Sequence, residues 1–297
     1  MIGNPRAGRG GVRQRWDELL ARLDRAGLAS TGQLTDAPGH ATELARRARA
    51  EGRSLVVAVG GDGTVHEVVN GLLAEGDDGP VPVLGVVPGG SGCDYARTFA
   101  LPDAIDEAVA LLASPSSPQA VDVGEVRCQG SEGACRRLFV NVAEVGIGAD
   151  VAHRAAGLPR SLGAGRYVVA FALTLAAHRQ VDADVEAALE RYEGPLTNLV
   201  VAIGQYFGGG MRVAPTADPA DGDFDVQVQF GSKLEYAMAM PRVFRGTHLP
   251  HPRVIEWRTA NLEIHSDPAA RLEADGELLG TTPATFRLLP GALRLKT

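Results

Sequence analysis

The sequence of 297 residues contains only three cysteines and two lysines, and it has no long apolar run. Cys93, Cys128 and Cys135 form neither a CxxC pair nor an even set, which excludes a disulfide framework and favours a reduced, cytoplasmic protein. The longest apolar stretch, residues 167–177, is shorter than the ~18 residues that a membrane-spanning helix requires, so we expect no transmembrane segment.

Positive charge is also in the minority. The chain has 29 Lys and Arg residues against 36 Asp and Glu, a formal net charge of −7, which argues against a nucleic-acid-binding protein. The histidines form no HExxH pair and no cluster with cysteine, so a zinc site is not expected. What is present, 45% apolar and 22% charged residues, is ordinary for a globular protein.

The first 120 residues alternate between two hydrophobic periods. Short, almost fully apolar runs predict buried strands at 54–60 and 81–90. Apolar residues at helical spacing predict helices at 16–28, 40–52, 64–76 and 103–114. Strands and helices in turn predict a parallel α/β sheet.

From residue 120 onward strand-like segments dominate, and one helical block at roughly 150–180 interrupts them. Turn signals bound the predicted strands, which fall at 120–128, 135–148, 184–192, 197–206, 223–230, 253–265, 270–277 and 285–290. Such a succession predicts an antiparallel sandwich or a barrel-like domain. We therefore place a domain boundary near residue 120.

The segment LVVAVGGDGTVHEVVNGLL, residues 55–73, joins a predicted strand to a predicted helix through a glycine-rich turn. Backbone N–H groups at such a junction form a cradle for anions, because glycine lets the backbone approach a phosphate closely. An aspartate in the turn can reach ribose hydroxyls or a Mg²⁺ ion. The alternative is a turn without a ligand, in which Asp62 or Thr64 only caps the helix.

Three other loops have the same character and follow the strand-like side of a βα unit. They are GNPRAGRGG (3–11), TDAPGHATELAR (35–46) and VVPGGSGCDYAR (86–97). Open α/β sheets bind ligands at the carboxyl ends of their strands, so four such loops predict a phosphate site there. The site lacks the lysine of a GxxxxGK[ST] loop and the third glycine of a GxGxxG turn, so we expect backbone amides, hydroxyls and a metal ion to bind the phosphates.

These loops carry a resemblance to a known family. NPRAGRG, GGDGTVHEVVNGL and PGGSGCDYAR resemble the ATP-site motifs of the diacylglycerol kinase catalytic family, which includes bacterial lipid kinases and sphingosine and ceramide kinases. NVAEVGIGADV (141–151), GGGMRVAPTADPADGDFDV (208–226) and EADGE (273–277) resemble its later motifs. The resemblance covers nearly the whole chain.

The resemblance implies a fold and an activity. The expected fold is an N-terminal α/β domain like those of phosphofructokinases and NAD kinases, at residues 1–120 and completed by 291–297, and an antiparallel β-sandwich domain at 121–290. The expected activity is ATP-dependent phosphorylation of a hydroxyl of diacylglycerol or a related, sphingoid-like lipid. The alternatives are an NAD kinase-like or other small-molecule kinase, or a nucleotide- or lipid-binding protein with impaired catalysis.

The resemblance also assigns site residues. The expected nucleotide-binding residues are Asn4, Thr35, Gly60, Gly61, Asp62, Gly63, Thr64, Val65, His66, Ser91 and Asp94. Asp218, Asp221 and Asp223 match a Mg²⁺ site of bacterial members, and a solvated acidic turn is the alternative. Asp275 resembles the catalytic base and Glu277 its helper. If both lie on one strand, side chains two apart share a face and converge on one hydroxyl; a plain β-turn is the alternative.

Two further features bear on activity and partners. Ser91, Cys93 and Tyr95 replace the threonine, asparagine and phenylalanine that are usual in the third motif, so a hydrogen bond of the site is lost at Cys93. The segment 156–180 combines an apolar helix with flanking arginines, as expected of a helix at an acyl pocket and an anionic interface or of an ordinary core helix. The implied partner is a lipid substrate at the inner membrane face; a homodimer stays open.

Overall fold

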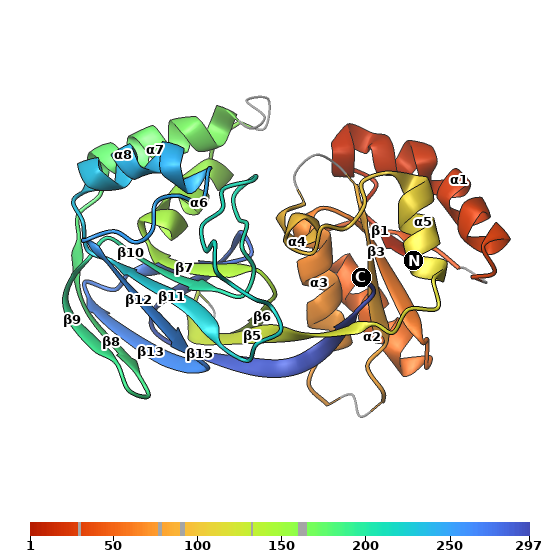
Figure 1. Cartoon of the computed structure of the whole chain (residues 1–297). Coiled ribbons are helices and arrows are strands. Elements are labelled where there is room, and N and C mark those ends of the chain that lie inside the picture. Colours follow the sequence, from red (N-terminus) through yellow and green to blue (C-terminus); the bar gives the residue numbers. More distant parts are fainter. Residues whose placement is uncertain (29–30, 77–78, 90–92, 132, 160–164) are drawn as a thin grey trace. The chain divides into compact units, whose positions relative to one another are not determined.

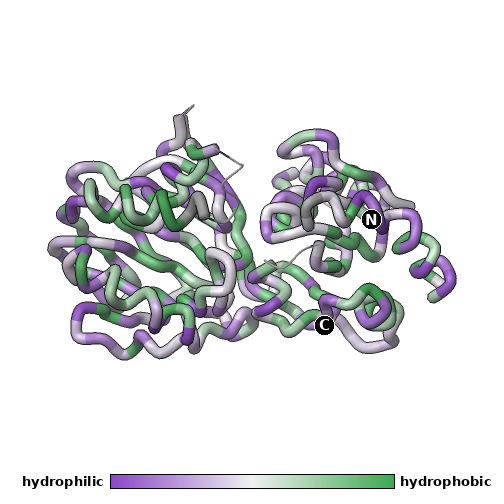
Figure 2. Tube along the Cα trace, turned by 90° about the horizontal axis from the view of Figure 1, so that it is seen from above, coloured by the Kyte–Doolittle hydropathy of each residue, from purple (hydrophilic) through white to green (hydrophobic). Residues whose placement is uncertain are grey.

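The computed structural model describes residues 1–297 except 29–30, 77–78, 90–92, 132 and 160–164 (Figure 1). The chain divides into two compact units. Unit 1 comprises Met1–Val123 and Pro290–Thr297, and unit 2 comprises Gly124–Leu289. In Figure 2 the hydrophobic segments lie mainly in the interior of each unit, and the hydrophilic ones lie on the outside. Each unit therefore has a core of its own.

Unit 1 is a parallel sheet with helices between its strands. Its strands are β1 (Ile2–Gly3), β2 (Gln33–Leu34), β3 (Leu55–Gly60) and β4 (Val83–Pro88), in the order β2–β1–β3–β4. Its helices are η1 (Ala7–Gly10), α1 (Gly11–Arg25), α2 (His40–Ala50), α3 (Asp62–Leu72), α4 (Asp94–Thr98) and α5 (Ile105–Ala113). The last strand of the chain, β15 (Glu277–Leu295), ends in this unit, where Leu295 pairs in parallel with Leu84 of β4.

The core of unit 1 follows from the two periods in the sequence. Trp16 and Leu19 of α1 lie in one cluster with Val57 and Val59 of β3. On α3, the glycine of the VVNGL segment lets α2 pack closely, because a Cβ on Gly71 would lie 2.2 Å from the Thr42 carbonyl oxygen. The strand–helix alternation that the sequence predicts thus produces a close-packed layer structure.

Unit 2 is antiparallel. Its strands are β5 (Gln119–Gly130, which begins in unit 1), β6 (Gly133–Phe139), β7 (Val142–Gly146), β8 (Val181–Ala187), β9 (Arg191–Leu196), β10 (Asn198–Ala202), β11 (Phe224–Gln229), β12 (Val254–Thr259), β13 (Asn261–Asp267), β14 (Arg271–Ala274) and most of β15. Its helices are α6 (Ile147–Ala156), α7 (Gly165–Ala177) and α8 (Lys233–Val243). Nine pairings between these strands in the described part of the unit are antiparallel: β5–β6, β7–β10, β7–β14, β8–β9, β8–β13, β10–β11, β11–β12, β13–β15 and β14–β15.

Strands in the middle of unit 2 are covered on both faces. Ala143 and Val145 of β7 point into the main core, where the rings of Phe139 and Phe224 stack with centroids 5.7 Å apart. Val142, one residue out of phase, belongs to a second cluster on the opposite face. Because side chains alternate along a strand, the even-numbered residues of β7 lie on the face that this second cluster covers.

The predicted elements of unit 2 need corrections. The segments 135–148, 184–192 and 253–265, each predicted as one strand, are each divided between two strands. Helix α8 has no counterpart in the prediction, although Ser232 and Glu235 form a capping box, which is readable from the sequence. Among the described residues, no helix combines the length and the apolarity needed to cross a bilayer.

Candidate functional site

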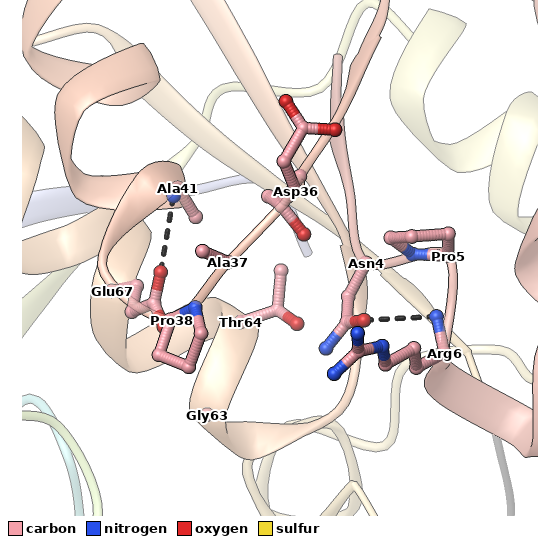
Figure 3. Close-up of a pocket in the computed structure, with 11 residues that line it drawn as sticks. Asn4, Pro5, Arg6, Asp36, Ala37, Pro38, Ala41, Gly63, Thr64 and Glu67 are labelled. Carbon is pink, nitrogen blue, oxygen red and sulfur yellow. Dashed lines mark hydrogen bonds between the residues drawn. The ribbon is translucent and has the colours of Figure 1, made fainter.

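A pocket in unit 1 collects residues from three of the glycine-rich loops (Figure 3). It is lined by Asn4, Pro5, Arg6, Thr35, Asp36, Ala37, Pro38, Ala41, Gly63, Thr64 and Glu67. Each group lies where a strand of the parallel sheet ends or the following helix begins. This is the edge at which open α/β sheets bind ligands.

Two helix N-termini contribute to the pocket. Helix α3 begins at Asp62, directly after β3 and Gly61, and places Gly63 and Thr64 in its first turn. Helix α2 begins at His40 and places Ala41 there. The Ala41 N–H donates to Glu67 Oε2 at 3.0 Å and the Thr64 N–H donates to the Gly61 carbonyl at 2.9 Å, so the attraction for anions at these two starts comes mainly from the helix dipole, which makes them electropositive. Such ends bind phosphate groups.

The loop after β1 closes another side of the pocket. The Asn4 side chain bends back over this loop, and its Oδ1 accepts a hydrogen bond from the Arg6 backbone N–H at 3.0 Å. Figure 3 shows the Thr64 hydroxyl turned toward Asn4. The Thr35 N–H donates to the Gly3 carbonyl at 2.8 Å, which fixes the hydroxyl-bearing residue beside β1. The pocket thus combines amides, hydroxyls and one guanidinium without a lysine.

Asp62 ties the third glycine-rich loop to α3. Its carboxylate accepts hydrogen bonds from the N–H groups of Asp94, at 3.1 Å, and Tyr95, at 2.9 Å. These are the first residues of α4, so Asp62 caps that helix from outside. Asp94 itself is 2% exposed and forms an ion pair with Arg97. Both aspartates therefore have a structural part in holding the loop.

The pocket gathers four of the predicted nucleotide-binding residues, Asn4, Thr35, Gly63 and Thr64. The other predicted residues do not line the pocket. Gly60 and Gly61 form the junction between β3 and α3, and Asp62 and Asp94 hold α4. Val65 and His66 are buried, and Ser91 lies outside the described residues. Burial beside Asp62 raises the pKa of the Cys93 thiol, which keeps that thiol protonated.

Seven of the eleven lining residues are absent from the prediction, and Arg6 and Glu67 are two of the charged ones. Glu67 Oε2 accepts a hydrogen bond from the Ala41 N–H at 3.0 Å and so links α3 to the start of α2. Its position was readable, because Glu67 follows Thr64 by three residues on a helix and therefore shares its face. Arg6 lies in the NPR segment, two residues after Asn4, which the family resemblance assigns to the nucleotide site.

In unit 2, Asp275 does not lie on a strand. Asp275 and Gly276 form the two-residue turn between β14 and β15, with φ of 49° and 86°. Two positive φ values are typical of a type I′ hairpin turn, for which Asp-Gly is a preferred sequence. The expectation that Asp275 and Glu277 share a strand face is therefore wrong, because the turn separates them.

Asp275 is 8% exposed, and backbone amides hold its carboxylate. It accepts hydrogen bonds from Val140 N–H at 2.8 Å, Asn141 N–H at 3.0 Å and Val142 N–H at 3.2 Å. The first two amides belong to the connection between β6 and β7, and Val142 is the first residue of β7. Glu277 is more open, with 40% side-chain exposure, and its Oε2 lies 3.4 Å from Arg137 Nε.

The three aspartates of the predicted metal site lie in the loop before β11. Asp218 accepts a hydrogen bond from the Ala220 N–H at 3.1 Å, and Asp221 accepts one from the Asp223 N–H at 3.1 Å. Asp221 also forms an ion pair with Arg258. Within the part of the chain that the structure describes, no three His, Cys, Asp or Glu side chains are grouped as metal ligands.

Comparisons with known proteins agree with this geometry. Residues 1–126 match the diacylglycerol kinase catalytic domain, and residues 141–297 match the YegS C-terminal NAD kinase beta sandwich-like domain. The chain is 28% identical over 288 residues to a diacylglycerol kinase of Staphylococcus haemolyticus, covering 96% of this chain and 84% of that protein. It is 28% identical over 290 residues to a Bacillus subtilis diacylglycerol kinase, covering 96% and 91%.

Solved structures support the fold. A diacylglycerol kinase structure from Bacillus anthracis has a TM-score of 0.73 at 21% identity and covers 99% of this chain and 94% of that one. Yeast NADH kinase complexed with NADH has a TM-score of 0.51 at 10% identity and covers 99% and 81%. The predicted fold class, a parallel α/β domain with an antiparallel β domain, is confirmed, and so is the resemblance that the motifs indicate.

Proposed function

The chain belongs to the family that joins a diacylglycerol kinase catalytic domain to a YegS C-terminal NAD kinase beta sandwich-like domain, and we propose that it is an ATP-dependent lipid kinase. It transfers the γ-phosphoryl group of ATP to a hydroxyl of diacylglycerol or of a related, sphingoid-like lipid. The oxygen–phosphorus bond to the lipid forms while the bond from the γ-phosphorus to ADP breaks. The lipid phosphate then enters phospholipid biosynthesis.

The observation that carries the proposal is the pocket of unit 1. First-turn residues of α2 and α3 line it together with the Asn4–Arg6 loop and Thr35. Amides with a favourable dipole suit the phosphates, the Arg6 guanidinium adds positive charge, and Asp36 and Glu67 offer acceptors for ribose hydroxyls. Phosphoryl transfer depends chiefly on positioning and charge stabilisation, which such groups supply.

In unit 2 we assign Asp275 as the base that accepts the proton of the lipid hydroxyl, with Glu277 as a second carboxylate. Three backbone N–H groups fix the Asp275 carboxylate, and such preorganisation suits a group that must meet a substrate hydroxyl in one geometry. Proton transfer to a positioned base contributes about 10²–10⁴-fold to a rate.

Enzymes that hydrolyse ATP or transfer its phosphoryl group commonly use Mg²⁺, and the family resemblance implies this ion here. Asp218, Asp221 and Asp223 do not fit such an ion as they lie, because Asp221 faces Arg258 and the carboxylates do not group as metal ligands among the described residues. We therefore derive no step of the reaction through an ion at these aspartates. A Mg²⁺ ion at these aspartates would require Asp221 to release Arg258; such a site stays a prediction, as does a homodimer.

An exposed apolar surface on unit 2 favours a lipid over a polar acceptor. Helices α7 and α8 are in contact through the rings of Phe171 and Tyr236, whose centroids lie 6.2 Å apart. Six large apolar side chains on these helices, or directly after α8, are exposed: Val168, Val169, Leu173, Leu234, Met238 and Phe244. A soluble monomer rarely exposes such a patch without a partner.

Basic residues lie on α7 and α8 or within two residues of their ends. The exposed cations are Arg179, Lys233, Arg242 and Arg245, whereas α7 has no acidic residue. The Lys233 ammonium group donates to the Ala176 carbonyl at 3.1 Å and joins the two helices. Exposed apolar side chains and cations on the same two helices suit an anionic lipid surface, where each cation contributes about 1 kcal/mol. We propose peripheral binding to the inner membrane face through this surface.

The proposal is tested by phosphate transfer to lipid. The full chain is incubated with Mg²⁺, γ-labelled ATP and anionic vesicles that contain diacylglycerol or sphingosine, and with NAD in parallel. We expect labelled lipid from the wild type and at least tenfold less from Asp62→Ala and Asp275→Asn. Asp103→Ala and Asp267→Asn, at exposed aspartates of the two units, are matched controls and should label normally.

The outcomes separate the alternatives. Labelled NAD without labelled lipid would replace the lipid kinase by an NAD kinase-like activity. No label in any acceptor, with ATP still bound, would leave a binding protein. Equal lipid labelling by the wild type and both site variants would refute the site assignment.

A further inference from the structure

Two glutamates of unit 2 face each other inside the sheet. Glu144 on β7 and Glu273 on β14 are direct partners in the antiparallel ladder, and they are 8% and 0% exposed. The neighbours Ala143 and Ala274 point into the main core, so both carboxyl groups lie on the opposite face. Directly opposed like charges destabilise a sheet, which makes a buried pair of this kind unusual.

The Glu144 carboxyl group is enclosed by specific contacts. Its Oε1 accepts a hydrogen bond from Asn198 Nδ2 at 2.8 Å, and Asn198 Oδ1 accepts one from the Gly148 N–H at 3.1 Å. A Cβ on Gly148 would lie 2.3 Å from Glu144 Oε2. The start of α6 therefore packs directly on the carboxyl group, and a larger residue at Gly148 would displace that group.

Glu273 connects the pair to the turn that carries Asp275. Its Oε2 accepts a hydrogen bond from the Gly276 N–H at 2.7 Å. Its Oε1 is buried and has no hydrogen-bond partner among the described residues. An unpaired buried oxygen costs about 1–3 kcal/mol, and more if it is charged, so a donor is required at this point. A proton on the pair supplies that donor.

The surroundings of the pair favour such a proton. Burial raises the pKa of Glu144 to about 7, and burial together with the charge of Glu144 raises the pKa of Glu273. Asp275 adds a further negative charge beside Glu273. From the covering helices, burial and the charge of Glu144 raise the pKa of Tyr236 on α8, and Asp150 of α6 forms an ion pair with Arg271 of β14 at 2.7 Å.

We propose that Glu144 and Glu273 share one proton and are positioning residues that hold the Asp275–Gly276 turn for phosphoryl transfer. The contacts form a closed circuit: Glu273 holds Gly276, Asp275 holds the amides of 140–142, and β7 continues from there to Glu144. Loss of the proton places two negative charges opposite each other and displaces the turn. The kinetic part of this inference rests on the proposed function.

The first test is the pH profile of lipid phosphorylation. Wild-type kcat should fall about tenfold per pH unit above the apparent pKa of the pair, because only the singly protonated pair holds the turn. Glu144→Gln replaces the shared proton by an amide N–H, so its kcat should be flat over the same range. Glu190→Gln, at an exposed glutamate of the same unit, should behave as the wild type. Parallel profiles for Glu144→Gln and the wild type would overturn the proposal.

The second test does not depend on activity. Infrared difference spectra of the wild type should show the band of a protonated carboxyl group near neutral pH that disappears as the pH rises. The band should be absent in Glu144→Gln and in Glu273→Gln, and present in Glu190→Gln. If no lipid is phosphorylated but the band behaves in this way, the proposed function fails and proton sharing stands. If lipid is phosphorylated and the band is missing from the wild type or unchanged in both variants, only this inference fails.

Discussion

The two units bring polar groups to their candidate sites in different ways. In unit 1 the groups are mainly backbone amides at the ends of strands and the starts of helices, and glycines mark them in the sequence. In unit 2 they are carboxylates buried in a sheet and its turn, and their contacts join segments far apart in the chain. A site made of backbone amides is encoded by residues adjacent in the sequence, whereas a site made of side chains on different strands depends on how those strands pair.

The largest effect should come from removing the Asp275 carboxylate. Asp275→Ala leaves three backbone N–H groups without their acceptor and puts alanine at φ of 49°, which should lower the stability of unit 2 by about 4 kcal/mol. Asp275→Asn keeps an acceptor and tolerates this φ, so it should cost about 1–2 kcal/mol.

Each unit has one tryptophan, which makes this measurable. Trp16 lies in unit 1 and Trp257 in unit 2, so urea unfolding followed by fluorescence in a Trp16→Phe background reports on unit 2. Equal stability of Asp275→Ala and Asp275→Asn would mean that the amide contacts do not hold the turn.

A smaller effect, on the order of 2 kcal/mol, should come from pH. Burial raises the folded-state pKa of Glu144 to about 7, above its ordinary value of 4.5. The folded state then binds more protons than the unfolded state between these values, so stability is greatest below pH 4.5 and falls as the pH rises to about 7. Urea unfolding at pH 5 and pH 8 should show this fall for the wild type and less of it for Glu144→Gln.

Glu125 of unit 2 is a control with the opposite pH dependence of stability. Burial opposes its charge, but hydrogen bonds from Arg127 and Arg136 outweigh burial and lower its pKa. Its contribution to stability is therefore present above pH 4.5 and is lost as the pH falls through its folded-state pKa. A wild-type stability that rises steadily from pH 5 to pH 8 would contradict the assignment to Glu144.

The smallest effect concerns the backbone site itself. A Cβ on Gly60 would lie 2.3 Å from Thr64 Oγ1, so Gly60→Ala should destabilise unit 1 by about 1–2 kcal/mol. A Cβ on Gly61 meets no atom within 4 Å, and φ there is −101°, so Gly61→Ala should stay within about 0.5 kcal/mol. Unfolding followed by Trp16 in a Trp257→Phe background measures both. Equal losses would show that close approach does not explain the first glycine.

Local signals made much of unit 1 predictable. The strand–turn–helix succession at 55–73 and the loops around Asn4 and Thr35 are encoded in adjacent residues, and the structure brings Asn4, Thr35 and Thr64 to one pocket. The role of Asp62 in capping α4 could not be read from its own segment, because the N–H groups that donate to it, of Asp94 and Tyr95, lie in another loop.

Unit 2 was predictable only in class. The segment EADGE reads equally well as a strand or as a turn, and the choice depends on how β14 and β15 pair. The pairing of Glu144 with Glu273 has no local signature, since the two lie on strands from different parts of the chain. Helix α8 is different, because its capping box was present in the sequence.

We assign the phosphates of ATP to the electropositive starts of α2 and α3. The most direct measurement is the amide NMR spectrum of the full chain during titration with a non-hydrolysable ATP analogue. We predict that the signals of Ala41, Gly63 and Thr64 move together and saturably, while that of Glu190 stays in place. Saturable nucleotide binding that leaves Ala41, Gly63 and Thr64 unmoved would contradict the claim.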